Sequence, residues 1–216
     1  MVTIKEMPAR EKYVKLLRTA GLTDQFVPQM IRERLNEEKV SELRKIWNEL
    51  LQPVPEDASF EEKHQIVLGN MMRKWTAALD FIRKHLGENG VEEFKRRDVD
   101  ADKGSVPASA QGMLKLIRAI SPRFAFKLAG SKRSYELQIL YPYEIKEMTP
   151  GKAVLHVAHC PLPDIPGAEE GCTFGCQVCH PLWLAEQFYV RMETVRSGKS
   201  CDTILSPVQL KTASDS

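Results

Sequence analysis

The stretch KAVLHVAHCPLPDIPGAEEGCTFGCQVCHP, residues 152–181, decides how this chain folds and where its chemistry lies. Its first nine residues are rich in apolar and β-branched side chains and predict a β-strand over 152–160. Pro161 ends the strand, so the chain must turn there. A dense group of cysteines follows over 172–179. The stretch therefore predicts a sheet that delivers the chain into a cysteine-bearing loop.

The residues after this loop have the spacing of an amphipathic helix. Pro181 suits the first position of a helix, and Gly198 suits its end. The apolar positions of the expected buried stripe are Leu184, Phe188, Met192 and Val195. We therefore expect a terminal helix over 181–198 and a flexible tail over 206–216.

A change of periodicity upstream of the strand indicates a hairpin. Residues 124–128 and 135–139 each alternate apolar with other side chains, and the pair Gly130-Ser131 lies between them as a turn. With the strand at 152–160, these segments predict a small antiparallel sheet. One helix, over 113–120, is expected before it.

The amino-terminal half has helical periodicity throughout. Apolar residues recur at helical spacing in four segments, which are 8–21, 40–51, 59–86 and a short piece around 91–94. Gly21 and Gly87 are the expected ends of two of them, and Ser59 with Glu62 forms a capping box. The sequence therefore predicts an α+β protein whose amino-terminal half is helical.

Three regions are expected along the chain. Residues 1–97 form the helical region, 108–205 form an α+β cofactor-binding region with the cysteine cluster, and 206–216 form the tail. The polar segment 98–107, which contains Gly and Pro, is the expected linker.

Composition excludes several classes of function. The chain has 216 residues, of which 43% are hydrophobic and 28% are charged, and its net charge is +2. This balance indicates a globular protein and gives no electrostatic reason to expect nucleic acid as a partner. No apolar stretch approaches the ~20 residues that a membrane span needs. Residues 1–13 lack the apolar core of a signal peptide, so the expected location is the cytoplasm, where thiols stay reduced.

All five cysteines lie in the last quarter of the chain. They are Cys160, Cys172, Cys176, Cys179 and Cys201. An odd number of clustered cysteines in a reducing compartment argues against a disulfide framework and for metal ligands or reactive thiols.

The spacing of three of these cysteines predicts a common centre. Cys172, Cys176 and Cys179 can converge because Gly175 permits a tight turn between them. Cys176 and Cys179 would lie at the amino terminus of the expected helix, where the helix dipole stabilises thiolates.

The fourth ligand is expected to be Cys160, with Cys201 as the alternative. Cys160 ends the ordered strand. Cys201 would lie beyond a helix of about 17 residues, which spans roughly 25 Å.

Three cofactors fit these ligands. A [4Fe–4S] cluster would use Cys172, Cys176 and Cys179 with Cys160 or Cys201. Structural zinc would use four of the cysteines or His180. Haem c fits because Cys176-Gln-Val-Cys179-His180 matches C-x-x-C-H. The favoured hypothesis is an iron–sulfur protein of redox or anaerobic metabolism, active in electron transfer, sensing or catalysis, with a redox partner protein.

Two histidines are candidate catalytic groups. Strand alternation places His156 on the same face as Cys160, and His180 directly follows Cys179. Either imidazole could deliver protons to a small molecule that binds beside the cofactor, against Trp183 and Phe188. The alternative hypothesis is a hydrolase or lyase of a small sulfur-containing or cyclic substrate. In it, Cys160 is the nucleophile or a zinc ligand and His156 is the base. A zinc-stabilised binding module without chemistry is a third hypothesis.

The second half of the chain also resembles a known group of small α+β proteins. A helix over 75–86 runs into Gly87, a hairpin follows, and a strand ends in Cys160-Pro161 with further cysteines beyond. This order, over residues 70–195, is similar to that of the L-2-amino-thiazoline-4-carboxylic acid hydrolase family and the broader four-vinyl-reductase-like small-molecule-binding domains. The resemblance implies a small-molecule site at Cys160 and the cysteines after it. The dense triplet of cysteines departs from a plain hydrolase and favours a bound cluster.

Overall fold

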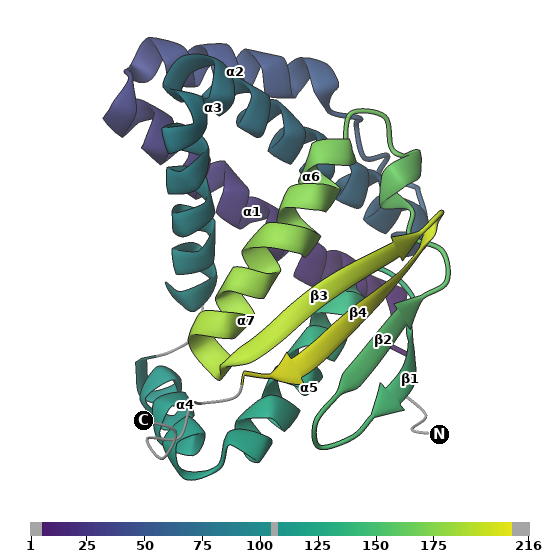
Figure 1. Cartoon of the computed structure of the whole chain (residues 1–216). Helices are drawn as coiled ribbons and strands as arrows, with labels where there is room; N and C mark the ends of the chain where they lie inside the picture. The colour runs from purple at the N-terminus through teal and green to yellow at the C-terminus, as the bar shows by residue number, and fades with distance from the viewer. Residues whose placement is uncertain (1–5, 105–107, 209–216) are drawn as a thin grey trace.

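Helices pack against one face of a four-stranded antiparallel sheet (Figure 1). The structure is a computed structural model that describes residues 6–104 and 108–208. It is mostly helical in its first half and places all of the described strands after residue 143. The α+β class predicted from the sequence is therefore confirmed.

The first two helices of the amino-terminal half are α1 (Ala9–Arg34) and α2 (Glu37–Leu50). The side chain of Asn36 begins α2 by accepting a hydrogen bond from the backbone N–H of Lys39. Gly21 lies inside α1 rather than at its end. Apolar side chains continue at helical spacing beyond it, and their burial outweighs the ~1 kcal/mol that an interior glycine costs.

Helix α3 (Phe60–Gly104) is the longest element and contains a break. It begins at the predicted capping box, where the Glu62 carboxylate accepts hydrogen bonds from the backbone N–H and the hydroxyl of Ser59. Gly87 interrupts it with φ 63°, a backbone conformation that favours glycine. The predicted helix end at Gly87 is thus a kink between two helices. The second of these continues through residues 98–104, which were expected to be linker, while 105–107 lie outside the described residues.

The predicted hairpin over 124–139 is wrong, because this segment forms α5 (Pro122–Leu140). Helix α4 (Ala108–Ile120) precedes it, as expected, and Ser121 caps α5 through the backbone N–H of Phe124. The buried positions of α5 follow helical spacing and include Phe126, Ala129, Arg133 and Leu137. The alternating pattern predicted strands because it counted Phe124 and Tyr135 as core positions. Both side chains are exposed, and without them the buried positions have helical spacing.

The sheet contains β1 (Glu144–Met148), β2 (Ala153–Val157), β3 (Val190–Ser197) and β4 (Ser200–Pro207). Its order is β1-β2-β4-β3, and every neighbouring pair is antiparallel. The strand predicted over 152–160 is confirmed as β2. The predicted helix over 181–198 is wrong beyond Phe188. Tyr189 ends that helix in the left-handed region, and the β-branched residues after it form β3.

The cysteine segment is helical rather than a loop. Helix α6 (Glu169–Phe174), a π-helical turn (Gly175–Cys179) and α7 (His180–Phe188) follow one another directly and form one continuous rod (Figure 1). Gly175 therefore makes no tight turn, and Cys176 and Cys179 do not lie at a helix terminus. The expected tight turn at Gly175 and the expected helix start at Cys176 and Cys179 are therefore both wrong.

The described core consists of three clusters that meet around α5 and α7. One packs Leu137 of α5 on Leu155 and Val157 of β2. A second joins α1, α2 and α3 to the cysteine segment, and a third joins α5, α7 and the strands β3 and β4. None of the described helices is long and apolar enough to cross a bilayer. The place where α5, the π-helical turn and the inner face of the sheet meet holds the candidate site.

Candidate thiol site

A buried cation, Arg133 of α5, lies at the centre of this region. Its side chain is 1% exposed. An isolated charge in such a place is strongly disfavoured, so it requires negative partners. One is Glu136, whose Oε2 is 3.5 Å from a terminal nitrogen of Arg133. Burial opposes the charged guanidinium, but the negative charges of Cys176 and Glu136 outweigh it and raise the pKa of Arg133. The site therefore pairs a cysteine with a buried guanidinium.

Cys176 is held between α5 and the sheet. Its carbonyl oxygen accepts a hydrogen bond of 3.2 Å from the hydroxyl of Thr194 on β3. Its Sγ lies 3.8 Å from the hydroxyl of Tyr141, the residue that ends α5. Burial and then the negative charge of Cys176 raise the pKa of Tyr141 well above its usual value. Tyr141 consequently stays protonated and can donate a hydrogen bond to the sulfur.

The π-helical turn explains why Cys176 occupies this position. Pro181 has no backbone N–H, so it cannot donate the helical hydrogen bond to the preceding turn. The backbone N–H of His180 instead reaches Gly175, five residues back. This wider turn keeps the helix continuous and leaves the Cys176 carbonyl available to Thr194. Such turns occur often at functional sites.

His180 and Glu136 add acid–base groups to the same place. His180 follows Cys176 by four residues along the rod, and its Nε2 lies 3.9 Å from Oε2 of Glu136. Nδ1 of His180 and Nε of Arg133 are buried, and neither has a hydrogen-bond partner within the described part of the chain. Buried polar atoms are nearly always paired in proteins. These two nitrogens are therefore available to a bound molecule.

Two further thiols lie close to Tyr141. Cys201 is on the inner face of β4, opposite Val157. The backbone N–H of Cys160 donates a hydrogen bond of 2.7 Å to the carbonyl of Lys199, which brings Cys160 beside the β3–β4 turn. The charges of Cys176, Cys160 and Cys201 all act on Tyr141. The argument that Cys201 is too distant is wrong, because α7 has only nine residues and the β3–β4 hairpin returns the chain to the site.

The other two cysteines are placed differently. Cys179 is buried among aromatic residues of the helical half, including Phe94 and Phe174. Cys160 belongs to a different cluster. Cys172 lies on α6, but its side chain is outside the described part of the structure. Among the side chains that are described, no three His, Cys, Asp or Glu residues form a group able to hold a metal ion. The four-cysteine ligand set stays a prediction.

His156 does not share a face with Cys160, so this expectation is corrected. His156 pairs with Asp202 across β2 and β4, and its Nδ1 lies 2.5 Å from the carboxylate. The hydrogen bond from His156 lowers the pKa of Asp202, and the charge of Lys146 adds to this effect. Leu155 and Val157 face the core on the other side of β2. Strand alternation fails at Cys160 because β2 ends at Val157.

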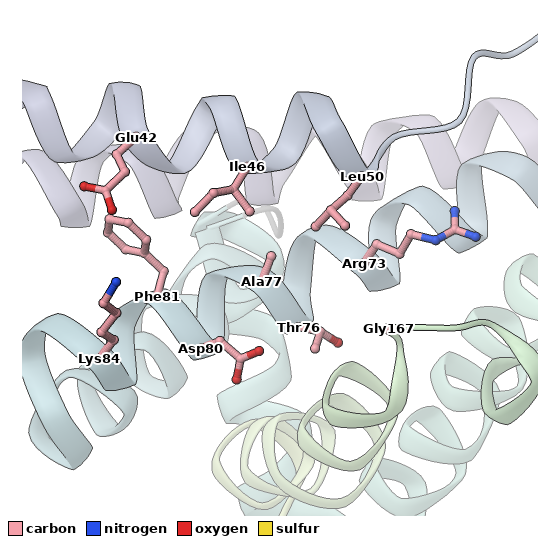
Figure 2. Close-up of a pocket in the computed structure, with 10 residues that line it drawn as sticks. All are labelled: Glu42, Ile46, Leu50, Arg73, Thr76, Ala77, Asp80, Phe81, Lys84 and Gly167. Carbon is pink, nitrogen blue, oxygen red and sulfur yellow. The ribbon is translucent and has the colours of Figure 1, made fainter.

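Two cavities lie near these elements. The first, of about 410 Å³, is lined by Tyr141, His64 and residues of the α1 amino terminus. The second, of about 370 Å³, lies between α2 and α3. Figure 2 shows Ile46 and Leu50 of α2 above Ala77 of α3, with Gly167 at one side. Tyr141 of the thiol site also lines the first cavity, whereas no residue of the thiol site lines the second.

Comparison with family models, curated proteins and solved structures found no match to this chain. Four residues of this site, Cys160, Cys176, Cys201 and His180, were already candidates from the sequence. Arg133, Glu136 and Tyr141 were not candidates, because their segment was expected to be a hairpin. The sequence did contain one signal for Arg133. If 122–140 is read as a helix, Arg133 falls on the same face as the buried apolar residues of α5.

Proposed function

We propose that this protein is a cysteine-dependent enzyme in which the Cys176 thiolate attacks an electrophilic centre of a small molecule. The observation that carries the proposal is the buried guanidinium of Arg133, whose charge is balanced by Cys176 and Glu136. A neighbouring cation is a recognised way to keep a cysteine as its nucleophilic thiolate. This is the hydrolase or lyase hypothesis with Cys176, rather than Cys160, as the nucleophile.

Each neighbour of Cys176 has a role in this chemistry. Arg133 stabilises the thiolate. His180, oriented by Glu136, delivers a proton to the leaving atom when the carbon–sulfur bond forms. Tyr141 donates a hydrogen bond to the sulfur and stabilises it when it leaves again. In a hydrolase, water then attacks the carbon that is bound to Cys176, and the thiolate is regenerated.

The cavity that Tyr141 lines has a size that suits a small ligand. Its volume of about 410 Å³ lies at the small end of the range for ligand sites, and Cys176, Arg133 and His180 are not among the residues that line it. The unpartnered nitrogens of Arg133 and His180 are donors that a substrate oxygen or nitrogen can use. The substrate class is therefore a small, polar electrophile, which accords with the small cyclic or sulfur-containing substrate expected from the sequence.

An iron–sulfur or zinc protein is the second candidate function. Three thiols act on Tyr141, and an adjacent guanidinium would offset the negative charge of a thiolate-bound metal. The ligand set predicted from the sequence, Cys172, Cys176 and Cys179 with Cys160 or Cys201, would hold such a metal and supply electron transfer or a Lewis acid. The two cysteines of the C-x-x-C-H motif lie in different surroundings. Cys176 interacts with Arg133, and Cys179 is buried in the aromatic cluster of the helical half, so the motif gives haem c no support beyond its sequence. Both candidates suit the cytoplasm, where thiols stay reduced.

Alkylation tests the proposal. We expect iodoacetamide to label Cys176 first and to do so at pH values below the ordinary cysteine pKa of about 8.5. Peptide mass spectrometry would locate the label, and a pH–rate profile would give the apparent pKa. Cys179→Ser is the matched control, because Cys179 lies three residues away in a different environment.

The same preparation separates the two candidate functions. Metal analysis and an absorption spectrum are measured on protein purified without oxygen. The thiol enzyme should contain iron and zinc far below one atom per chain. Stoichiometric metal that is lost in Cys176→Ser would replace the proposal with the metal-protein alternative. Labelling of Cys176 no faster than of Cys179 would refute the nucleophile assignment.

A further inference from the structure

One segment of the chain carries a strong excess of positive charge. Residues 103–135 contain seven lysine and arginine residues and no Asp or Glu. The rest of the chain holds 24 basic and 29 acidic residues, so its net charge is −5. The small net charge of the whole chain therefore conceals two regions of opposite sign, and the positive region favours an anionic partner.

Helix α4, which lies in this segment, exposes apolar side chains to solvent. Leu114 packs on the third core cluster, so one face of the helix is anchored to the protein. Met113, Leu116 and Ile120 recur at intervals of three and four residues and lie on another face. All three side chains are more than half exposed, and Ile120 is 73% exposed. Because a globular protein normally turns such a stripe towards its core, the exposed stripe indicates an interaction surface.

This surface continues across the corner between α4 and α5, at one end of the molecule (Figure 1). Ser121 alone separates the two helices. Its backbone N–H donates a hydrogen bond of 2.8 Å to the carbonyl of Ile117, and its side chain caps α5, so hydrogen bonds fix the corner. The corner surface consists of exposed apolar and basic side chains from both helices, which are Met113, Leu116, Ile120, Phe124, Lys115 and Arg123.

We propose that the corner surface binds the face of an anionic lipid bilayer. Lys115 and Arg123 are exposed and form no ion pair within the described part of the chain, so both cations can contact lipid phosphates. A helix whose exposed side chains are apolar and basic lies in the interface of a membrane. Its apolar side chains enter the boundary of the acyl chains, and its cations stay at the headgroups. This arrangement places the protein on the bilayer rather than across it.

Other occupants fit the corner surface less well. A second copy of the chain would bring Lys115 and Arg123 against cations of the same sign, which repel each other. Nucleic acid would use the two cations but would leave the apolar stripe exposed. A small molecule or a peptide in a groove would need a cavity, and neither of the two cavities described above is lined by a residue of the corner surface.

This inference is independent of the proposed function, because the corner surface contains no residue of the thiol site. The test mixes the full-length chain with vesicles of phosphatidylcholine, either alone or with added phosphatidylglycerol, and measures binding by flotation. We expect binding to the anionic vesicles, far less binding to the neutral ones, and weaker binding at high salt, which screens the charges.

Two variants test the two components of the corner surface. Ile120→Ser should weaken binding to the anionic vesicles at least ~10-fold, because it removes a large apolar side chain from the lipid. Lys115→Gln combined with Arg123→Gln should weaken it ~10-fold or more, since each cation near an anionic surface adds to the attraction.

The matched controls are exposed residues on other helices. They are Leu17→Ser on α1 and the pair Arg44→Gln and Lys45→Gln on α2, and both control proteins should bind as the wild-type chain does. Circular dichroism should be unchanged in every variant, because all of the substituted side chains are exposed.

Three results would overturn the proposal. The first is equal binding to neutral and anionic vesicles, or unchanged binding in both variants of the corner surface. The second is a chain that floats with neither kind of vesicle but sediments as a dimer that Ile120→Ser dissociates, which would make the corner surface an interface between two copies. The third is binding to duplex RNA instead of vesicles, lost only when Lys115 and Arg123 are replaced, which would make nucleic acid the partner.

Discussion

At the scale of single residues, Arg133 is the side chain on which the site depends. It is the largest of the fully buried side chains, and a charged group in that position is tolerated only because Cys176 and Glu136 surround it. Sequence reasoning could find the cysteines, because their spacing is a recognisable pattern. It could not find Arg133, because a buried cation has no local signature and depends on which residues the fold brings to it.

Replacing Arg133 with Met should lower both stability and reactivity. Glu136 and Cys176, which are only partly buried, lose their counter-ion, so the loss of stability should lie below the ~3–5 kcal/mol that breaking a fully buried pair costs. Without the guanidinium, Cys176 should become a thiol at neutral pH, so its alkylation at pH 7 should slow at least ~10-fold. Urea unfolding and the alkylation rate measure the two effects. Lys127→Met is the control, because Lys127 is on the same helix and is exposed. Unchanged alkylation in Arg133→Met would contradict the role assigned to this residue.

Another buried side chain, His64, should make stability depend on pH. Its Nε2 lies 2.6 Å from the carbonyl of Ile139, so Nε2 donates the hydrogen bond. Burial lowers the pKa of His64 in the folded state, although the hydrogen bond to Ile139 partly opposes this. The unfolded chain therefore binds a proton more readily than the folded chain. The stabilising effect is present above the unfolded pKa of about 6.5 and is lost as the pH falls below it.

The measurement is the urea midpoint between pH 7.5 and pH 5. We expect it to fall for the wild-type chain and to fall less for His64→Gln, which cannot take up the proton. His159→Gln is the control, since His159 is exposed. Equal pH dependence in the wild-type chain and in His64→Gln would show that other groups control the effect.

At the scale of elements, helices and strands were predicted correctly where caps, glycines or a clear apolar spacing mark them in the sequence. The helices over 40–51 and 59–86 were predicted correctly because their apolar residues recur at helical spacing, and Ser59 and Gly87 mark two ends of the second one chemically. The segment 124–139 was read with the wrong period, since exposed apolar residues on α5 imitate a strand. The chain after Phe188 was read as helix, but Tyr189 and the β-branched residues of β3 end it. The π-helical turn was not predicted, because Pro181 was taken as the first residue of a new helix rather than as a residue inside a continuous one.

Replacing Pro181 with Ala tests what the π-helical turn does. Alanine restores the missing N–H and favours a regular α-helix, and proline in a helix interior costs ~3 kcal/mol relative to alanine. We expect equal or higher thermal stability together with slower alkylation of Cys176, because a regular turn would rotate the sulfur away from Arg133. Pro122→Ala is the control, since Pro122 starts α5 and occupies a favourable position. Faster alkylation in Pro181→Ala would show that the π-helical turn does not position the thiol.

At the scale of the whole molecule, the helical region and the cysteine region share a core. Phe174 packs its ring against Trp75 and Phe94 of α3. Ion pairs between Arg83 and Glu170 and between Arg96 and Glu186 join the same surfaces. The α+β class could be predicted from the order of patterns along the chain, but this joint core required the packing of distant segments.

A shared core predicts one unfolding transition. Circular dichroism follows the helices, and tryptophan fluorescence follows Trp47 and Trp75 in the helical region and Trp183 on α7. Both signals should change at the same urea concentration. The fragment 108–208 made alone should lack a cooperative transition, because Phe174 and Cys179 lose their partners on α3. Two separate transitions in the intact chain would mean that the halves fold independently.

The order of the sheet has a consequence for how the protein is made. β4 is the last of the described strands to be synthesised, yet it lies between β2 and β3 in the interior of the sheet. The described strands that precede it therefore cannot complete the sheet until β4 has left the ribosome. Cys176 leaves the ribosome before Cys201 does, so the nascent chain carries an incomplete site. Insertion of β4 between its two neighbours is then the step that assembles the site.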